Sequence, residues 1–254
     1  SRVIPCLLVH NKGLVKTVKF KSPKYVGDPI NAVKIFNEKE VDELIVLDID
    51  ATVNGVEPNY KMIENLANES RMPLCYGGGV KTAEQAQKII KLGVEKVAIS
   101  SEAINNPSLL PEIANIIGRQ SVVVVIDVKK SLFGTYEIYS HNGKVKVKKN
   151  LLEFITELES IGIGELVINS IDNDGVMKGY DLALIKKVRD CVDLPLTVLG
   201  GAGSVDDIIN LIDEYKIIGA SAGSLFVFKG KYKAVLISYL PEVILNKIRL
   251  ISKR

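Results

Sequence analysis

The feature that most constrains this chain is an internal duplication. The segment DELIVLDID at residues 42–50 returns as GELVINSID at residues 164–172, an offset of 122 residues. The same offset relates three further pairs: Pro73 and Pro195, Gly78 and Gly200, and Gly79 and Gly201. Similarity at a fixed period indicates repeated structural units. We therefore expect two tandem halves, about residues 1–120 and 121–254, that share one architecture.

Each half contains short apolar runs separated by helical patterns. Runs that are largely apolar and do not alternate are typical of strands buried on both faces of a parallel sheet, and they occur at residues 44–49, 94–99, 122–126, 166–168, 196–199 and 217–222. Residues 82–92 and 205–212 carry apolar side chains at helical spacing. The alternation predicts an α/β fold, a single (β/α)8 TIM barrel with a twofold half-barrel duplication. A doubly wound open sheet is the alternative, but the dinucleotide fingerprint is absent from the sequence.

Composition and charge narrow the class of protein. The formal net charge is +3, basic residues are scattered among acidic ones and there is no Trp, which argues against nucleic-acid or membrane-surface binding. Cys6, Cys75 and Cys191 lie in apolar stretches and form no CxxC pair, so we expect buried reduced thiols. No secretory leader or membrane-spanning run is evident. We expect a soluble cytoplasmic protein without metal or cofactor.

Two glycine-rich loops follow strands at related positions. Gly77–Gly79 and Gly200–Gly203 each precede a helix, where bare backbone N–H groups favour a phosphate. A single loop of this kind is weak evidence, whereas two loops related by the duplication favour two phosphate sites. The phosphate-binding residues that we predict are Gly78, Gly79, Ser100, Ser101, Asp174, Gly175, Gly200, Gly201 and Ser224. A ligand phosphorylated at both ends would span the mouth of the barrel.

Carboxylates at strand ends are the candidate acid–base groups. Asp127 follows the most apolar strand and is the preferred catalytic residue, because a carboxylate in a half-closed mouth can exchange a proton. Asp172 and Asp174 precede Gly175 and could bond nearby backbone N–H groups instead. His10 and His141 stand alone in the sequence, and we expect both at the surface or in loops.

Eight short motifs follow one another along the chain: IPCLL, DPINA, DELIVLDIDA, CYGGGV, NPSLL, QSVVVVIDVK, GELVINSIDNDGVMKGYD and GGAGS. Their sequences and their order resemble those of the cyclase subunit of imidazole glycerol phosphate synthase. This resemblance covers nearly the whole chain. It implies a barrel that binds a bis-phosphorylated substrate and pairs with a glutaminase subunit, whose ammonia crosses the barrel. It also implies an ammonia gate of Arg2, Glu43, Lys96 and Glu165; a salt-bridged plug of the barrel floor is the alternative role for these four residues.

The resemblance implies two catalytic aspartates, one after the first strand and one after the fifth, and a lysine in a loop. The chain keeps the second aspartate as Asp127 and the lysine as Lys16, but Leu8 stands in place of the first aspartate. Ser100–Ser101 and Val176 also differ from the usual cyclase residues. These departures resemble a second group of cyclase-like proteins, which accompany a sugar amidotransferase in surface-glycan biosynthesis.

Three hypotheses follow. The preferred one is an ammonia-relay partner that binds a glutaminase and supplies ammonia to a sugar amidotransferase for acetamidino-sugar formation. The second is an authentic cyclase of histidine biosynthesis, a carbon–nitrogen lyase in which Asp127 acts alone or with Asp172. The third is a noncatalytic scaffold that has kept only the fold and the docking face.

Overall fold

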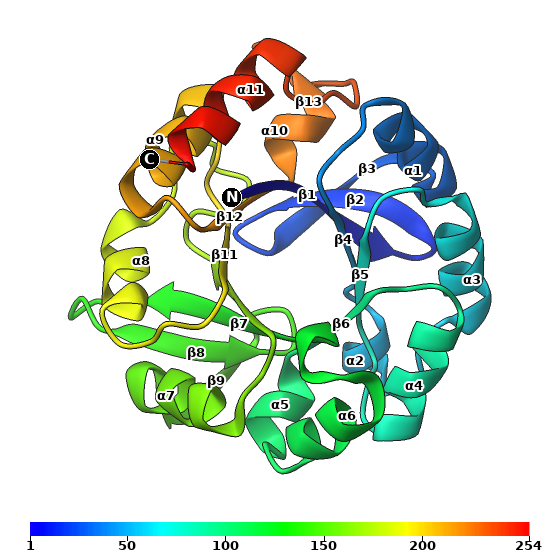
Figure 1. Cartoon of the computed structure of the whole chain (residues 1–254), viewed down its shortest axis with the longest axis vertical. Coiled ribbons are helices and arrows are strands. Elements are labelled where there is room, and N and C mark those ends of the chain that lie inside the picture. The colour runs from blue at the N-terminus through cyan, green and yellow to red at the C-terminus, as the bar shows by residue number, and fades with distance from the viewer. Residues whose placement is uncertain (254) are drawn as a thin grey trace.

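The computed structural model describes residues 1–253 and is a closed barrel (Figure 1). Its eight parallel strands are β1 (Arg2–His10), β4 (Leu44–Asp48), β5 (Leu74–Gly77), β6 (Lys96–Ile99), β7 (Val122–Lys130), β10 (Glu165–Ser170), β11 (Leu196–Leu199) and β12 (Gly219–Ala222). Parallel pairing of β6 with β7 joins the two halves, and pairing of β12 with β1 closes the ring. The predicted TIM barrel is confirmed.

Helices surround the strands as the crossover connections of a parallel barrel. They are α1 (Pro29–Glu38), α2 (Ala51–Asn54), α3 (Tyr60–Glu69), α4 (Ala83–Lys91), α5 (Ser101–Asn105), α6 (Leu109–Ile117), η1 (Arg119–Ser121), α7 (Leu151–Ile161), α8 (Leu182–Arg189), α9 (Val205–Tyr215), α10 (Ser224–Val227) and α11 (Glu242–Ile251). The duplication extends to the helix caps. Thr82 and Gln85 form a capping box at α4, and Ser204 and Asp207 form one at α9, 122 residues later.

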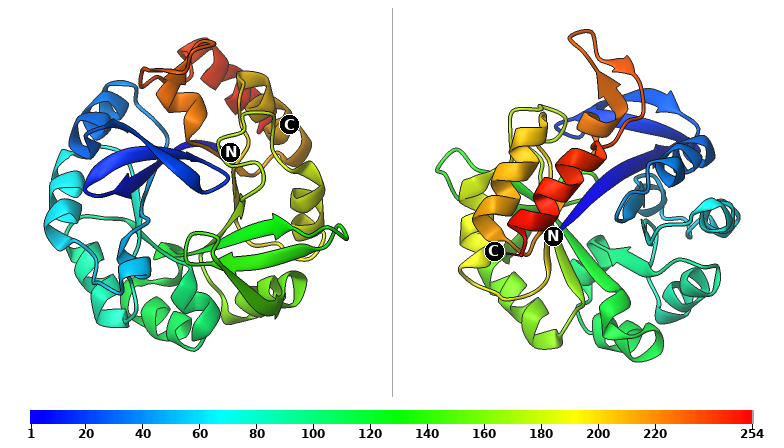
Figure 2. Two further views of the ribbon diagram at one scale, coloured as in Figure 1. Left: turned by 180° about the vertical axis from the view of Figure 1, so that it is seen from behind. Right: turned by 45° about the horizontal axis from the view of Figure 1, so that its top comes forward.

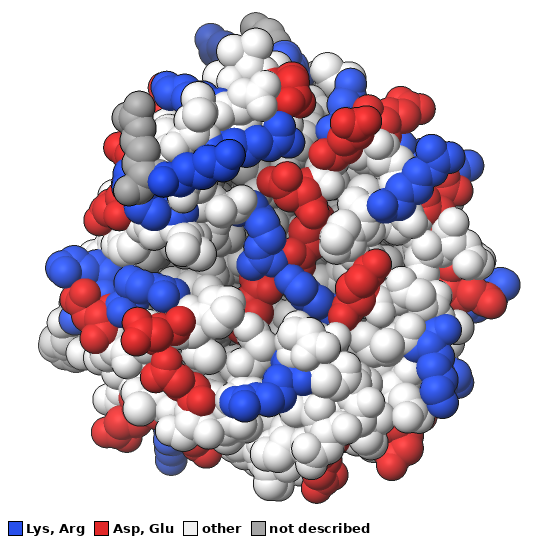
Figure 3. All heavy atoms as spheres, viewed as in Figure 1, with Lys and Arg blue, Asp and Glu red and all other residues white. Residues whose placement is uncertain are grey.

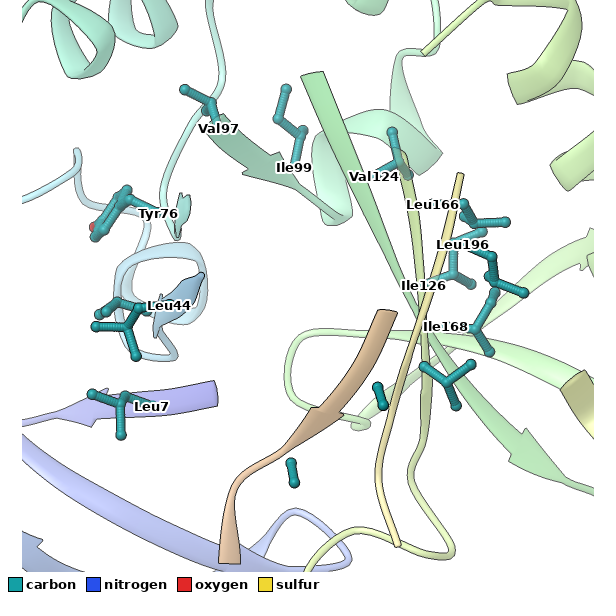
Figure 4. Packing of buried hydrophobic residues seen from close by; sticks show 14 of the residues in the cluster. Leu7, Leu44, Tyr76, Val97, Ile99, Val124, Ile126, Leu166, Ile168 and Leu196 are labelled. Atoms are coloured by element: carbon teal, nitrogen blue, oxygen red, sulfur yellow. The ribbon is translucent and has the colours of Figure 1, made fainter. Parts of the chain in front are cut away.

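The sheet separates two layers of apolar side chains, as strands buried on both faces must. The outer layer fills the space between strands and helices; Figure 4 shows part of it, including Leu7, Leu44 and Tyr76 on neighbouring strands. The inner layer fills the barrel and consists of Ile4, Cys6, Ile45, Cys75, Ala98, Val123, Val125, Val167 and Leu199, with Leu8 and Leu47 packed against it. The barrel interior is therefore a packed core between its two ends.

Antiparallel ribbons extend two of the barrel strands beyond the ring. β1 continues into β2 (Gly13–Val18) and β3 (Lys21–Gly27), and β7 continues into β8 (Tyr136–Ser140) and β9 (Val145–Asn150). Seen from behind, both ribbons cross the ring (Figure 2, left). A short hairpin of β13 (Phe228–Lys229) and β14 (Ala234–Val235) projects from the same end (Figure 2, right).

Each ribbon reaches the opposite half-barrel. Phe20, in the β2–β3 turn, donates its N–H to the Asp174 carboxylate at 3.1 Å. Asn142, 122 residues later and in the β8–β9 turn, donates its side-chain N–H to the Ile49 carbonyl at 2.7 Å. The two halves are thus tied across the mouth by related residues.

The structure also corrects one expectation. Cys6 and Cys75 are buried thiols as predicted, but Cys191 is exposed, because it follows α8 in the turn that leads to β11.

Within residues 1–253, no helix is long and apolar enough to cross a membrane.

Candidate active site

A cavity of about 520 Å³ lies at the carboxyl ends of the barrel strands, where active sites of such barrels are found. It brings together most of the mouth residues that the sequence indicated: Leu8, Lys16, Gly78, Gly79, Ser100, Ser101, Asp127, Asp174, Gly175, Gly200, Gly201 and Ser224. Among residues 1–253, no group of three or more His, Cys, Asp or Glu side chains is placed to hold a metal ion.

Asp127 is the best-placed acid–base group. It is the last inward-facing residue of β7 before the ribbon and is paired in register with Asn169 of β10. The pKa of Asp127 is raised to about 7, mainly by burial and to a smaller extent by the nearby Asp174 carboxylate, while a 2.9 Å bond from the Asn169 side-chain N–H opposes the shift. A carboxyl group that titrates near neutrality can both accept and return a proton.

Asn169 is a site residue that the sequence interpretation missed. It is buried, and its Oδ1 has no hydrogen-bond partner. The signal was present in the duplication, because an amide stands in the apolar run LVINS where the first half has Leu47. A buried polar side chain in such a strand requires a reason, and holding the Asp127 carboxyl supplies one.

The first half has an apolar pair at the corresponding place. Leu8 of β1 is paired with Leu47 of β4, as Asp127 is paired with Asn169, and Leu47 precedes Asn169 by 122 residues. Leu8 is thus the barrel-symmetry counterpart of Asp127. The cavity has a titratable carboxyl group with its amide partner on one side and two leucines on the other.

Lys16 and Asp174 lie close to Asp127. Lys16 is buried on β2, and its Nζ donates to the Cys6 carbonyl at 2.5 Å. Burial lowers the pKa of Lys16, while Asp174 acts in the opposite sense. Asp174 accepts a 2.7 Å bond from the Thr17 hydroxyl, and burial raises the pKa of its carboxyl. The β2–β3 ribbon therefore delivers Lys16 to the cavity and is held there by Asp174.

The carboxylate Asp172 is not part of this cluster. It does not line the cavity and instead accepts the Lys130 N–H at 2.8 Å. It bonds a backbone N–H as the sequence suggested, but that N–H lies at the end of β7 and not in the turn of Asp172 itself. Asp174 is the carboxylate that shares the cavity with Asp127.

The two glycine-rich loops have the same geometry in both halves. Gly78 and Gly200 have φ angles of +128° and +94°, in the region that favours glycine. A Cβ at Gly78 would strike the Asp48 carbonyl, and one at Gly200 would strike the Ser170 carbonyl. Because Asp48 and Ser170 are themselves 122 residues apart, the loops are equivalent cradles. Their use for phosphate remains a prediction.

Short helices complete both cradles. Ser100 precedes α5, which begins at Ser101, and α10 begins at Ser224. All three serines line the cavity. Backbone N–H groups at such helix starts, together with the hydroxyls, are suited to an anion.

The two histidines are not isolated in space. His10 ends β1, and its Nδ1 lies 2.6 Å from the Asp50 carboxylate, while His141 occupies the β8–β9 turn. Both line the cavity. The loop position predicted for His141 is confirmed, whereas His10 is the last residue of a barrel strand, and the sheet brings it beside Asp50 in the loop after β4.

The four predicted gate residues meet at the amino ends of the strands. Arg2 Nη2 lies 2.7 Å from Glu165 Oε1, and Arg2 also contacts Glu43. Lys96 Nζ lies 2.9 Å from both glutamates. Seen from this end, basic and acidic side chains lie side by side at its centre (Figure 3). The ring closes the barrel floor.

Thr197 is a further member of the ring that the sequence did not indicate. Its hydroxyl donates to Glu165 Oε1 at 2.6 Å, and it is fully buried on β11. Burial by itself would raise the pKa of Glu165, but Arg2, Lys96 and Thr197 outweigh it and hold the pKa below its ordinary value. Glu165 is therefore ionised in the folded protein near neutral pH.

The interior between floor and cavity is apolar and neutral. It is the inner layer described above, and its two thiols stay protonated, because burial raises the pKa of Cys6 to about 11 and that of Cys75 well above its ordinary value. The free energy of desolvation is small when an uncharged molecule such as ammonia enters such surroundings, and it is large for an ion.

Comparison with known proteins agrees with this geometry. The model of the family described as "Histidine biosynthesis protein" matches residues 2–233. The chain belongs to this family. It is 60% identical over 240 residues to a Vibrio vulnificus protein provisionally named imidazole glycerol phosphate synthase subunit hisF3, with 94% of this chain and 92% of the relative covered.

Two further relatives also match most of the chain. A Pseudomonas aeruginosa protein provisionally named imidazole glycerol phosphate synthase subunit hisF2 is 55% identical over 247 residues, covering 97% of each chain. The imidazole glycerol phosphate synthase subunit HisF of Exiguobacterium sibiricum is 39% identical over 226 residues, covering 89% of this chain and 90% of the relative. The recognised cyclase family is thereby confirmed. These names favour the histidine-pathway alternative over the glycan hypothesis, to which none of the three refers.

Proposed function

We propose that the chain is the cyclase-type subunit of a glutamine-dependent complex. A glutaminase would dock at the floor ring of Arg2, Glu43, Lys96 and Glu165, and ammonia would cross the apolar interior to the cavity. The observation that carries the proposal is the placement of the charged ring and the Asp127 cavity at opposite ends of one neutral barrel interior. The resemblance in sequence and the names of the relatives support it.

The first candidate reaction is that of imidazole glycerol phosphate synthase. Ammonia attacks the phosphoribulosyl formimino substrate, and ring closure and cleavage give imidazole glycerol phosphate and an aminoimidazole carboxamide ribotide. The two glycine cradles would hold the two phosphates. Asp127 would move the protons, since its pKa lies near 7. The charge of the nearby Asp174 carboxylate contributes to the raised pKa of Asp127.

The second candidate is an ammonia relay without its own cyclisation, and Leu8 is the observation that favours it. Leu8 and Leu47 replace any proton-exchanging pair in the first half of the cavity, so chemistry shared between two carboxylates would lose a partner. Ammonia would then leave through the mouth to an amidotransferase, such as one that forms an acetamidino sugar.

One experiment separates these candidates. The purified chain is given saturating ammonium salt and the cyclase substrate, and the formation of imidazole glycerol phosphate is followed. Product formation supports the first candidate. Absence of product, combined with stimulation of a bound glutaminase, supports the second.

The docking of the glutaminase is tested separately. Glutamine hydrolysis is measured with the chain and with its Glu43→Gln variant, which removes one of the two carboxylates that Lys96 contacts. Equal stimulation by the two proteins, or no stimulation by either, would contradict a functional gate at the floor.

A further inference from the structure

A lysine-rich surface with exposed apolar side chains lies beside the mouth. We define it as the exposed side chains of residues 18–25, around the β2–β3 turn and β3, together with those of residues 229–236 in the β13–β14 hairpin. We call it the mouth-side patch. The hairpin projects beyond the barrel next to the first ribbon (Figure 2, right).

The charge of the patch has one sign. Neither segment contains Asp or Glu, and together they expose six lysines: Lys19, Lys21, Lys24, Lys229, Lys231 and Lys233. Since the whole chain has a formal net charge of +3, these lysines more than account for its positive charge. A surface of this kind attracts acidic partners and disfavours a second copy of itself.

Large apolar side chains stand between the lysines. Tyr232 is 90% exposed, Tyr25 is 66% exposed and Leu236 is 54% exposed. Isolated exposed apolar residues are ordinary, but tyrosines are enriched at the energetic centres of protein interfaces, and charged residues such as these lysines suit the polar rim around such centres. The composition therefore favours a protein surface as the occupant.

The two segments are held together before any partner binds. Lys24 Nζ lies 5.1 Å from the centre of the Phe228 ring, which joins β3 to the base of the hairpin. The Leu236 N–H donates to the Val227 carbonyl at 2.8 Å and anchors the returning strand. A preformed patch loses less conformational entropy on binding.

The patch borders the cavity. Phe20 and Pro23, on the same ribbon, line the cavity wall. A protein seated on the patch would thus stand over the mouth. Ammonia that escapes into neutral water takes up a proton and loses the lone pair needed for attack, so an enzyme that consumes it has to bind at the exit.

We propose that the mouth-side patch docks an acidic surface of the enzyme that consumes the ammonia. This inference rests on the ammonia-relay candidate above. Positively charged lysines steer the acidic partner, and Tyr25, Tyr232 and Leu236 provide the buried contacts. The cavity of one protein then opens into the active site of the other.

The test uses the full chain in complex with its glutaminase, and a purified ATP-dependent N-acyl-sugar amidotransferase as the probe. Binding is measured by surface plasmon resonance at low and high salt. We compare the wild type with a charge variant, Lys229→Glu, Lys231→Glu and Lys233→Glu, and with an apolar variant, Tyr232→Ser and Leu236→Ser. The control reverses three exposed lysines on outer helices: Lys91→Glu, Lys187→Glu and Lys247→Glu.

We expect the wild type and the control to bind, both variants to bind about tenfold or more weakly, and only the charge variant to lose salt dependence. Equal binding by all proteins, or no binding of the amidotransferase by the wild type, would overturn the proposal. So would patch-dependent binding to vesicles of phosphatidylglycerol without binding to the amidotransferase. Stimulation of glutamine hydrolysis is measured in parallel, because its absence would instead show that the proposed function has failed.

Discussion

Leu8 and Asp127 occupy equivalent positions in the two half-barrels. Each lines the cavity from its strand, and their register partners Leu47 and Asn169 are separated by the 122-residue repeat. One half therefore presents a carboxyl group with a pKa near 7, and the other presents a hydrocarbon. This asymmetry is the main determinant of what the cavity can do.

The Leu8→Asp variant should gain cyclase turnover. A second proton-transfer group at the equivalent place is expected to raise the rate with saturating ammonia by about 10²-fold or more. The matched control is Leu47→Asp, which places the same charge on the neighbouring strand and should give no gain. If the wild type already matches Leu8→Asp, then Asp127 suffices and Leu8 does not limit the reaction.

The Asp127→Asn variant should lose turnover and gain stability at high pH. Because the folded pKa is about 7 and the ordinary value is 3.8, the folded state binds the proton more tightly between these values. Its stability therefore falls as pH rises from about 4 to about 7. The variant lacks this penalty, so its melting temperature should exceed that of the wild type at pH 8 and match it near pH 4. A constant difference across this range would show that Asp127 does not titrate as inferred.

Replacing Asn169 should move the titration of Asp127. The Asn169→Leu variant removes the hydrogen bond that favours the ionised carboxylate, so the pKa of Asp127 should rise further. The readout is the protonation of the Asp127 carboxyl, followed by its infrared absorption in difference spectra against Asp127→Asn. An unchanged midpoint would mean that Asn169 has no part in setting the proton affinity of the site.

The floor ring should be sensitive to loss of one cation. Lys96→Met leaves the two buried glutamates paired with Arg2 and bonded to Thr197 but without their second cation, and we expect a loss of about 2–3 kcal/mol in the free energy of unfolding. Lys61→Met, in the exposed pair with Glu64, is the control and should cost less than about 0.5 kcal/mol. Urea unfolding at pH 7 measures both, and equal costs would refute a cooperative ring.

The same ring should weaken in acid. The pKa of Glu165 is held below its ordinary value, so its contribution is present above the ordinary carboxyl pKa and is lost as pH falls through the folded pKa. The difference between wild type and Lys96→Met should therefore shrink at acid pH.

The glycine-rich loops should lose phosphate binding when a side chain is added at Gly200. Gly200→Ala places a Cβ against the Ser170 carbonyl at a positive φ, and it should abolish the rise in melting temperature that inorganic phosphate gives. Gly55→Ala is the control, since Gly55 has a φ of +66° but open space around its Cα, and it should keep the phosphate effect. Retention of phosphate binding by Gly200→Ala would remove the cradle from the proposed site.

Most of the fold could be predicted from local pattern. The apolar runs at residues 44–49 and 196–199 are β4 and β11 to within a residue, and residues 82–92 frame α4. Buried parallel strands need continuous apolar sequence and crossover helices need an apolar face, so both leave a readable signal. The ribbons β2–β3 and β8–β9 were not foreseen, because their exposed strands mix lysine with apolar residues and lack that signal.

The sequence by itself determined the barrel and the repeat, because hydrophobic periodicity is a local property. The residues of the floor ring were implied by the resemblance to the cyclase family. Only the tertiary structure decided which of these residues meet. It joined Asn169 to Asp127, His10 to Asp50 and Thr197 to Glu165, and it exposed Cys191. Pairing across parallel strands links residues dozens of positions apart, and burial depends on what packs above them. Proton affinity and charge pairing at this site therefore follow from the closed barrel.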